Sequence, residues 1–337
     1  MKILPLNLAT CFLAFVVFNP QIEAAEEGKI FTALAMTKAQ ESSPIPTDSG
    51  VFLYDHKSDT WERTGPVIQS VSSIAIDPSN PEVVFLACGN GIVRSQDGGD
   101  TWRMTSGWRE SDFTKIAIDP TDGNNVYAAS VWGISVSRDG GDTWARANKG
   151  LAERYSRTII VDHRKPKRLL LGTADGIYQS NDGAKSWRGV RSSPRLAILR
   201  IARSAANPDL WIAGTEGEGV FLSTNDGKSW SESAPELDDA NVYAVAMDSS
   251  DESRLAAAGW DTGVWVSNDG GTSWVDRGAG LPSRNVTAMT YDPNYAGRLW
   301  VSTFEEGTLY SDNEGRTWND GGLKGAYVFD LGVVPFK

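Results

Sequence analysis

The chain has 337 residues, and 40% of them are hydrophobic, which is enough to form a large core. Its formal net charge of −11 at pH 7 argues against nucleic acid and anionic membrane surfaces as partners and permits a cationic partner. The 34 glycines suit an all-β protein with many tight turns.

Residues 1–24 have the pattern of a secretory signal peptide. Lys2 supplies a positive start, residues 3–18 are mostly apolar, and Ala24 ends a suitable cleavage site. The alternative is an uncleaved membrane anchor, but the apolar run is shorter than the roughly 18–20 uninterrupted residues that a span needs. We expect a mature domain of residues 25–337 that is exported, either periplasmic or secreted, and has no membrane span.

After signal cleavage, Cys88 is the only cysteine, so no internal disulfide is expected. It ends the apolar run VVFLAC, a position that favours a buried, inert thiol over a nucleophile. His56 and His163 are the only histidines, and no catalytic triad or histidine metal site is indicated. We predict neither a cofactor nor a metal.

The mature chain begins with an incomplete repeat unit, followed by a complete one. The pattern predicts a second strand at 29–36, a third at 51–55 and a fourth at 60–64, without a first strand. The next unit shows all four strands, at 71–77, 82–88, 91–96 and 101–105. Four strands of this length joined by turns predict one antiparallel sheet.

The first strand of this unit returns along the chain. It recurs at 115–119, 159–162, 245–248 and 289–292, and the fifth unit departs with 201–204 (IARS). The chain ends with Tyr327–Pro335, which matches a first strand and has no unit after it. We therefore predict that this C-terminal strand completes the first unit and closes a ring.

Every unit carries an eight-residue phrase. Six copies are SQDGGDTW (95–102), SRDGGDTW (137–144), SNDGAKSW (180–187), STNDGKSW (223–230), SNDGGTSW (267–274) and SDNEGRTW (311–318), and a worn copy is YDHKSDTW (54–61). The seven final tryptophans are 41–44 residues apart. A fixed period of this size indicates one supersecondary unit repeated seven times.

The phrase has the composition of a turn. Its Asp or Asn can accept N–H groups two residues on, and the glycine two residues later can take positive φ at low cost. Ala184 and Ser58 stand in place of that glycine, so their turns should be strained. The tryptophan is expected to begin the fourth strand and to cover the sheet.

The pattern S-x-D-x-G-x-[TS]-W resembles the Asp-box, or bacterial neuraminidase repeat. It occurs in sialidases, xyloglucanases, sortilin-type receptors and photosystem II assembly factors. The resemblance implies an all-β, seven-bladed β-propeller of four-stranded antiparallel blades, in which the boxes are structural and face away from the ligand site. The expected structural box residues are Asp97, Trp102, Asp139, Trp144, Asp182, Trp187, Asn225, Trp230, Asp269, Trp274, Asn313 and Trp318.

Three tryptophans remain once box and strand positions are subtracted. These are Trp108, Trp132 and Trp260, all in loops of the opposite face, and Phe304 aligns with Trp260. With Arg109, Asp261 and Glu305 they make the expected ligand-binding face. Exposed aromatics beside carboxylates suit a sugar chain or an extended peptide. The alternative is that the rings pack on neighbouring loops and the acids are solvated.

Two further features can reach that face. Arg154, Arg157, Arg195 and Arg200 could form a basic group at units four and five, although solvation is the simpler interpretation of each alone. Met36–Ser49 is the longest insertion and could be a lid or only a loop.

A glycosidase needs two carboxylates about 5–10 Å apart across the scissile bond. The weak catalytic candidates are Asp175, Glu216, Glu218, Asp261, Glu305 and Glu306, and no spacing singles out a pair. The chain lacks the Arg-Ile-Pro segment that a resemblance to sialidases would require. Xyloglucanases place their site between two propellers, whereas this chain has repeats for one.

The sequence therefore favours an exported, non-catalytic propeller that binds a protein partner or an envelope or extracellular glycan through its loop face. Its layout as a single ring is closest to the photosystem assembly factors. The alternative is a sialidase-like or xyloglucanase-like glycoside hydrolase.

Overall fold

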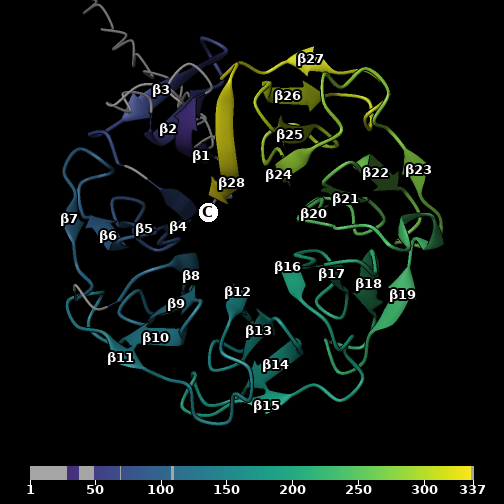
Figure 1. The fold of residues 1–337 in the computed structure, drawn as a ribbon. Coiled ribbons are helices and arrows are strands. Elements are labelled where there is room, and N and C mark those ends of the chain that lie inside the picture. Colours follow the sequence, from purple (N-terminus) through teal and green to yellow (C-terminus); the bar gives the residue numbers. More distant parts are fainter. Residues whose placement is uncertain (1–28, 38–48, 69, 108–109, 335–337) are drawn as a thin grey trace, which may run out of the picture.

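The computed structural model describes residues 29–37, 49–68, 70–107 and 110–334. These residues form 28 strands in seven four-stranded antiparallel sheets, which are arranged as the blades of a ring (Figure 1). Within the described ranges, no helix is long and apolar enough to cross a membrane. The predicted fold, a seven-bladed β-propeller, is confirmed.

Each blade runs from an inner first strand to an outer fourth strand. Blade 1 contains β28 (Ala326–Val334), β1 (Lys29–Thr37), β2 (Gly50–Asp55) and β3 (Thr60–Thr64). Blade 2 contains β4 (Val71–Ile76), β5 (Val84–Cys88), β6 (Gly91–Ser95) and β7 (Arg103–Met104); blade 3 contains β8 (Phe113–Ile118), β9 (Val126–Ser130), β10 (Gly133–Ser137) and β11 (Ala145–Arg146). Blade 4 contains β12 (Ser156–Val161), β13 (Leu169–Thr173), β14 (Gly176–Ser180) and β15 (Arg188–Gly189); blade 5 contains β16 (Ile198–Arg203), β17 (Trp211–Thr215), β18 (Val220–Ser223) and β19 (Ser231–Ser233). Blade 6 contains β20 (Ala244–Met247), β21 (Leu255–Gly259), β22 (Gly263–Ser267) and β23 (Val275–Asp276); blade 7 contains β24 (Val286–Tyr291), β25 (Leu299–Thr303), β26 (Gly307–Ser311) and β27 (Asn319–Asp320).

The ring closes through the two ends of the described chain. Strand β28 pairs antiparallel with β1, from Lys29 opposite Val334 to Thr37 opposite Ala326. In Figure 1 the yellow β28 lies beside the purple β1 and β2. The predicted closure of blade 1 by the C-terminal strand is therefore confirmed, and β28 covers the edge of β1 that would otherwise be unpaired.

The outer strands differ from the prediction. In blade 2 the fourth strand begins at Arg103, one residue after the box tryptophan, and pairs with β6 through only two residues. The same displacement holds in blades 3 to 7, whereas Trp61 does lie inside β3. In these blades the tryptophan belongs to the box turn and not to the fourth strand, so only two or three residues of that strand pair with the third strand.

The blades pack face to face through apolar side chains. Phe31 of β1, Val71 of β4 and Leu86 of β5 belong to one buried cluster that joins blades 1 and 2. Cys88 lies in the same cluster with no exposed surface, and burial raises the pKa of its thiol to about 12. The predicted burial of this thiol is confirmed.

The box turns are held by a bond pattern that differs from the predicted one. In the first complete copy, Asp97 Oδ1 accepts the N–H of Thr101 at 2.9 Å, and the Thr101 hydroxyl donates to Oδ2 at 2.5 Å. The Ser95 hydroxyl oxygen accepts the N–H of Gly99 at 2.8 Å. Both backbone N–H groups lie four residues after the side chain that they bind. The predicted bond from the box Asp to the N–H two residues on is therefore wrong. That shorter bond occurs instead after the first strands, as between Asp77 and the N–H of Ser79.

Two successive residues with positive φ follow the box Asp or Asn. In the first copy they are Gly98 and Gly99, with φ of 70° and 106°. Ala184 takes φ of 66°, which confirms the predicted strain in that turn. The expectation for Ser58 is wrong, because the worn turn is built on Asp55, with positive φ at Asp59 instead.

The box tryptophans join one blade to the one before it. Trp187 Nε1 donates to the Ala147 carbonyl of blade 3 at 2.8 Å, and Trp318 Nε1 donates to the Arg277 carbonyl of blade 6 at 2.8 Å. Trp61, Trp144 and Trp274 make the equivalent bond to the preceding blade. Trp102 and Trp230 bond within their own boxes. The boxes therefore act both as turns and as ties between blades.

The acidic boxes predict a specific response to low pH. Hydrogen bonds from the Thr or Ser four residues on hold the pKa of the carboxyl groups at about 2; the four residues are Asp97, Asp139, Asp182 and Asp269. A carboxyl pKa that is lower in the folded state stabilises the fold above the unfolded value of about 4, and this contribution is lost as pH falls through about 2.

The unfolding free energy should fall between about pH 4 and pH 2, and we expect Asp97→Asn to make this fall less steep. The change in slope should correspond to at most one proton fewer taken up on unfolding. Stability at pH 7 should change little, because Asn225 makes the same bond to the N–H of Ser229 in a natural box. Urea unfolding at a series of pH values measures this slope, and an unchanged slope would contradict the assignment.

Candidate functional site

The topology divides the connections between two faces. Links between second and third strands, and between successive blades, lie on what we call the loop face; box turns and links between first and second strands lie on the opposite box face. Trp132, Trp260 and Phe304 lie between second and third strands, and so on the loop face as expected. Trp108 and Arg109 lie outside the described residues.

An aromatic cluster crosses three blades of the loop face. The ring of Phe304 lies 5.2 Å from that of Trp260 and 4.8 Å from that of Tyr327, in edge-to-face contacts. The Tyr327 hydroxyl donates to Glu305 Oε1 at 3.0 Å. Phe304 thus packs on neighbouring residues, whereas Trp260 keeps 46% of its surface exposed. Tyr327 extends the site beyond the predicted residues, and the only sequence signal for it is an aromatic residue at the start of the closing strand.

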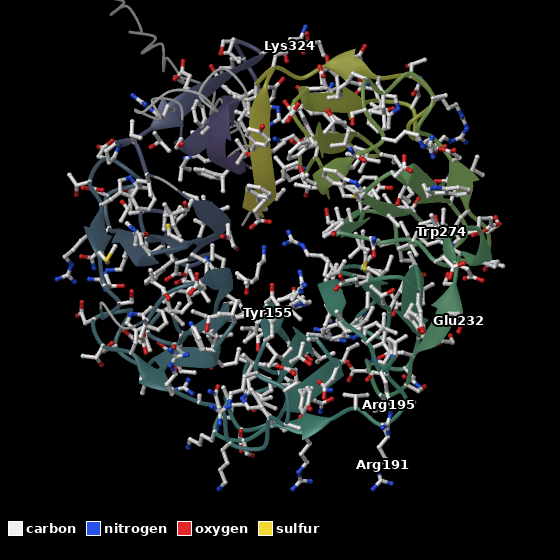
Figure 2. All side chains as sticks on the ribbon, viewed as in Figure 1. Tyr155, Arg191, Arg195, Glu232, Trp274 and Lys324 are labelled. Atoms are coloured by element: carbon white, nitrogen blue, oxygen red, sulfur yellow. The ribbon has the colours of Figure 1, made fainter. Side chains whose placement is uncertain are left out.

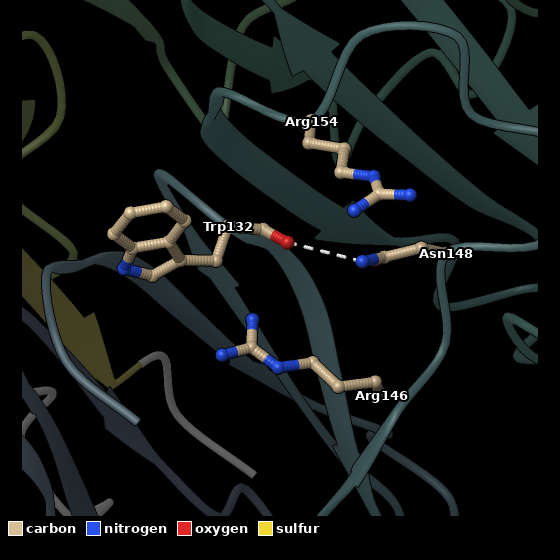
Figure 3. Close-up of a pocket in the computed structure, with 4 residues that line it drawn as sticks. All are labelled: Trp132, Arg146, Asn148 and Arg154. Carbon is tan, nitrogen blue, oxygen red and sulfur yellow. Dashed lines mark hydrogen bonds between the residues drawn. The ribbon is translucent and has the colours of Figure 1, made fainter. Parts of the chain in front are cut away.

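Trp132 borders a separate pocket of about 470 Å³ (Figure 3). Its other lining residues are Arg146, Asn148 and Arg154. The Asn148 side chain donates to the Trp132 carbonyl at 3.0 Å and accepts the N–H of Ile134 at 2.7 Å, so it holds the tryptophan loop. The two guanidinium groups lie on either side of the Trp132–Asn148 bond. Trp132 itself is 54% exposed.

The charge of this pocket is positive. Arg146 Nε lies 3.6 Å from Glu110 Oε1, so one acid partly balances it. Arg154 is exposed at the end of the link into β12, two residues before that strand begins. Guanidinium groups beside an indole face suit a ligand that carries a carboxylate or another hydrogen-bond acceptor next to an apolar group.

The four arginines expected to form one basic group take different positions. Arg157 lies 4.6 Å from the centre of the Tyr155 ring and pairs with Glu216 at 3.5 Å. Arg200 lies on the inner strand β16 of the propeller and binds Asp330. Arg195 lies toward the outer part of the ring in Figure 2. The hypothesis of a single basic group at blades 4 and 5 is therefore wrong.

The candidate acids make separate contacts. Asp175 accepts bonds from the hydroxyls of Thr173 and Tyr178 at 2.7 and 3.1 Å. Asp261 and Glu305 take positive φ at the same place in two loops, 59° and 65°, so both serve tight turns. The six candidates, Asp175, Glu216, Glu218, Asp261, Glu305 and Glu306, are distributed over blades 4 to 7.

A group of charged side chains lies on the inner strands, around the centre of the propeller. Asp330 of β28 has no exposed surface; it binds Lys115 Nζ of blade 3 at 2.7 Å and the Arg200 guanidinium of blade 5. The N–H of Ile74 in blade 2 also donates to Asp330, at 3.2 Å. One carboxylate thus joins four blades.

Burial and charge shift the pKa values of this central group. Burial, reinforced by the Arg200 charge, lowers the pKa of Lys115 to about 8. Burial acts to raise the pKa of Asp330, but the Arg200 and Lys115 charges hold it well below its usual range. Lys115, Arg200 and Asp330 occupy equivalent positions in the repeated inner-strand pattern, where other blades have Ser73, Thr158, Ala244 and Ala288. That contrast is the sequence signal for the group.

Within the described parts of the chain, no group of three or more His, Cys, Asp or Glu side chains could hold a metal ion.

Comparison with known proteins places the chain among the propellers. No protein-family model matches it. In sequence it is similar to the xyloglucanase Xgh74A of Acetivibrio thermocellus, with 25% identity over 238 residues that cover 64% of this chain and 25% of the xyloglucanase. The chain thus spans about a quarter of the length of the curated relatives it matches.

Two kinds of solved structure share the fold. The GH74 enzyme of Niastella koreensis aligns with a TM-score of 0.68 and 17% identity, over 88% of this chain and 54% of that one. YCF48 bound to a D1 peptide aligns with a TM-score of 0.57 and 17% identity, over 76% of this chain and 83% of that one. The chain therefore shares the β-propeller fold with these proteins.

The central group predicts a large effect on stability. Asp330→Ala leaves the Lys115 and Arg200 charges without their buried partner, so the unfolding free energy should fall by about 3–5 kcal/mol. Asp320→Ala is the matched control, because it breaks an exposed pair with Lys324 and should cost less than about 1 kcal/mol. Urea unfolding of the purified variants measures both, and equal losses would contradict a structural role for the central group.

Proposed function

We propose that this protein is an exported, non-catalytic binding platform whose loop face holds an extended segment of a partner protein or a glycan chain. The observation that carries the proposal is the pair of half-exposed tryptophans, Trp132 and Trp260, in equivalent loops of blades 3 and 6. Large aromatic side chains that remain exposed on one face are typical anchors of an interface.

Each tryptophan is supported by its surroundings. Trp260 makes an edge-to-face contact with Phe304, which makes another with Tyr327, so the position of Trp260 is set before a ligand binds. Trp132 is held through Asn148 and flanked by two arginines. The two anchors therefore differ in chemistry, one apolar and one cationic.

Further aromatic surface lies at the inner ends of the loops. Tyr155, Tyr243 and Phe329 expose between 36% and 45% of their surface. Tyr243 directly precedes Ala244, and Phe329 directly precedes Asp330. Tyr155 lies close to the centre of the propeller in Figure 2. These rings offer contacts to a ligand that crosses the face between Trp132 and Trp260.

The comparisons support this role in part. The structure of YCF48 was determined with a D1 peptide, and the alignment with this chain covers 83% of YCF48. A peptide ligand on a propeller of similar extent favours a protein partner here.

A glycoside hydrolase is the second candidate, and the sequence similarity to a xyloglucanase favours it. Its acid and base would come from the loop-face carboxylates, with Asp261 and Glu305 closest in sequence to Trp260 and Phe304 of the aromatic cluster. Release of reducing ends from xyloglucan, measured for wild type and for Asp261→Asn and Glu305→Gln, tests it. Turnover that either variant abolishes would establish the hydrolase and overturn the non-catalytic platform.

The platform makes a separate prediction. Trp132→Ala and Trp260→Ala should each reduce capture of partners from an envelope extract by about tenfold, because each removes an anchor worth about 1.4 kcal/mol or more. Val275→Ala is the control, since Val275 is equally exposed but lies on the outer strand β23. Quantitative pull-down, with thermal unfolding to verify folding, measures the effect. Unchanged capture by both tryptophan variants would rule out the loop face as the binding surface.

A further inference from the structure

The charge of this acidic chain is unevenly distributed. Residues 138–203 contain 15 of the 32 Lys and Arg residues but only 6 of the 43 Asp and Glu residues. That segment has a net charge of +9, whereas the remainder has −20. It runs from the box of blade 3 to the inner strand of blade 5, so blade 4 forms a basic sector in an acidic ring.

A groove of about 890 Å³ opens in this sector on the box face, opposite the loop face. It lies between blades 3 and 4, where the box turns meet the links between first and second strands. Its exposed cations are Arg138, Lys165, Lys167 and Lys185. The groove is separate from the pocket beside Trp132.

Two of these cations are already engaged. Arg138 donates to Asn125 and to the Tyr127 hydroxyl at 2.8 and 3.0 Å, and Lys165 pairs with Asp226 at 2.9 Å. Among the described residues, no ion pair or hydrogen bond is found for the side chains of Lys167 and Lys185. Both are exposed at the groove, so their ammonium groups are available to a ligand.

The groove also contains carboxylates, which are held by hydrogen bonds within their own turns. Asp182 accepts the N–H of Ser186 at 2.9 Å and the Ser180 hydroxyl at 2.8 Å. Asp119 and Asp122 are bound in the same way by their own turn. These fixed negative charges would repel a uniformly charged polyanion such as nucleic acid or a sulfated glycan. They leave room for a chain whose acidic groups are separated by neutral ones.

We propose that this groove binds an acidic peptide segment of a partner protein, in which carboxylates separated by neutral residues contact Lys167 and Lys185. The main chain of such a segment finds an amide N–H donor in the side chain of the exposed lining residue Asn181. The site does not depend on the loop face, because the two lie at opposite ends of the strands.

A fluorescein-labelled synthetic peptide in which glutamates alternate with glycines tests the proposal by fluorescence anisotropy. Wild-type protein should bind it, with affinity falling about tenfold between about 50 and 300 mM NaCl. Lys167→Glu combined with Lys185→Glu should weaken binding by about thirtyfold or more, because two attractions become repulsions. Lys228→Glu is the matched control, since Lys228 occupies the position of Lys185 in the box of blade 5, and it should change affinity less than about twofold.

Thermal unfolding of the double variant separates loss of binding from loss of fold, and Trp132→Ala should leave peptide binding unchanged. Equal binding by the double variant and wild type would overturn the proposal. So would tighter binding of heparin or of single-stranded DNA of the same charge with the same sensitivity to Lys167 and Lys185, because the groove would then be a general polyanion site.

Discussion

The pairing of β28 with β1 is the constraint on which the ring depends. Nine-residue strands from the two ends of the described chain meet in one sheet, and their register brings Asp330 opposite Ala33. This places a carboxylate in the centre of the ring, where it binds Lys115 and Arg200 from distant blades. Closure therefore depends on a ladder of hydrogen bonds and on one buried ionic group, without a disulfide among the described residues.

Around this closure, the box turns perform the same task in each blade. The Ser and Asp or Asn of a complete box tie its two positive-φ residues into a turn, and most of the tryptophans bond to the preceding blade. Because those residues are occupied by structure, function falls to side chains that interrupt the repeat. The loop face has Trp132 and Trp260, and the box face has the basic groove around Lys167 and Lys185.

Local regularity explains what could be predicted. Trp187, Trp318 and their equivalents recur at a nearly fixed period, so the number of blades and the order of the strands in each follow from counting. The errors concern details of the turns, because an Asp can bind N–H groups at more than one separation, and only the backbone of the finished turn selects between them. The sequence left open whether Trp132 and Trp260 are exposed or packed on neighbouring loops, and in the structure both are about half exposed.

By itself, the sequence determined the class of fold, the seven blades, the closing strand and the structural role of the boxes, because each follows from a pattern repeated along the chain. The tertiary structure alone decided which residues from different blades meet. It separated Arg200 from Arg154, packed Tyr327 against Phe304, and brought Lys167 and Lys185 to the same groove as Arg138. Such contacts depend on how blades far apart in sequence pack side by side, and no local periodicity encodes that arrangement.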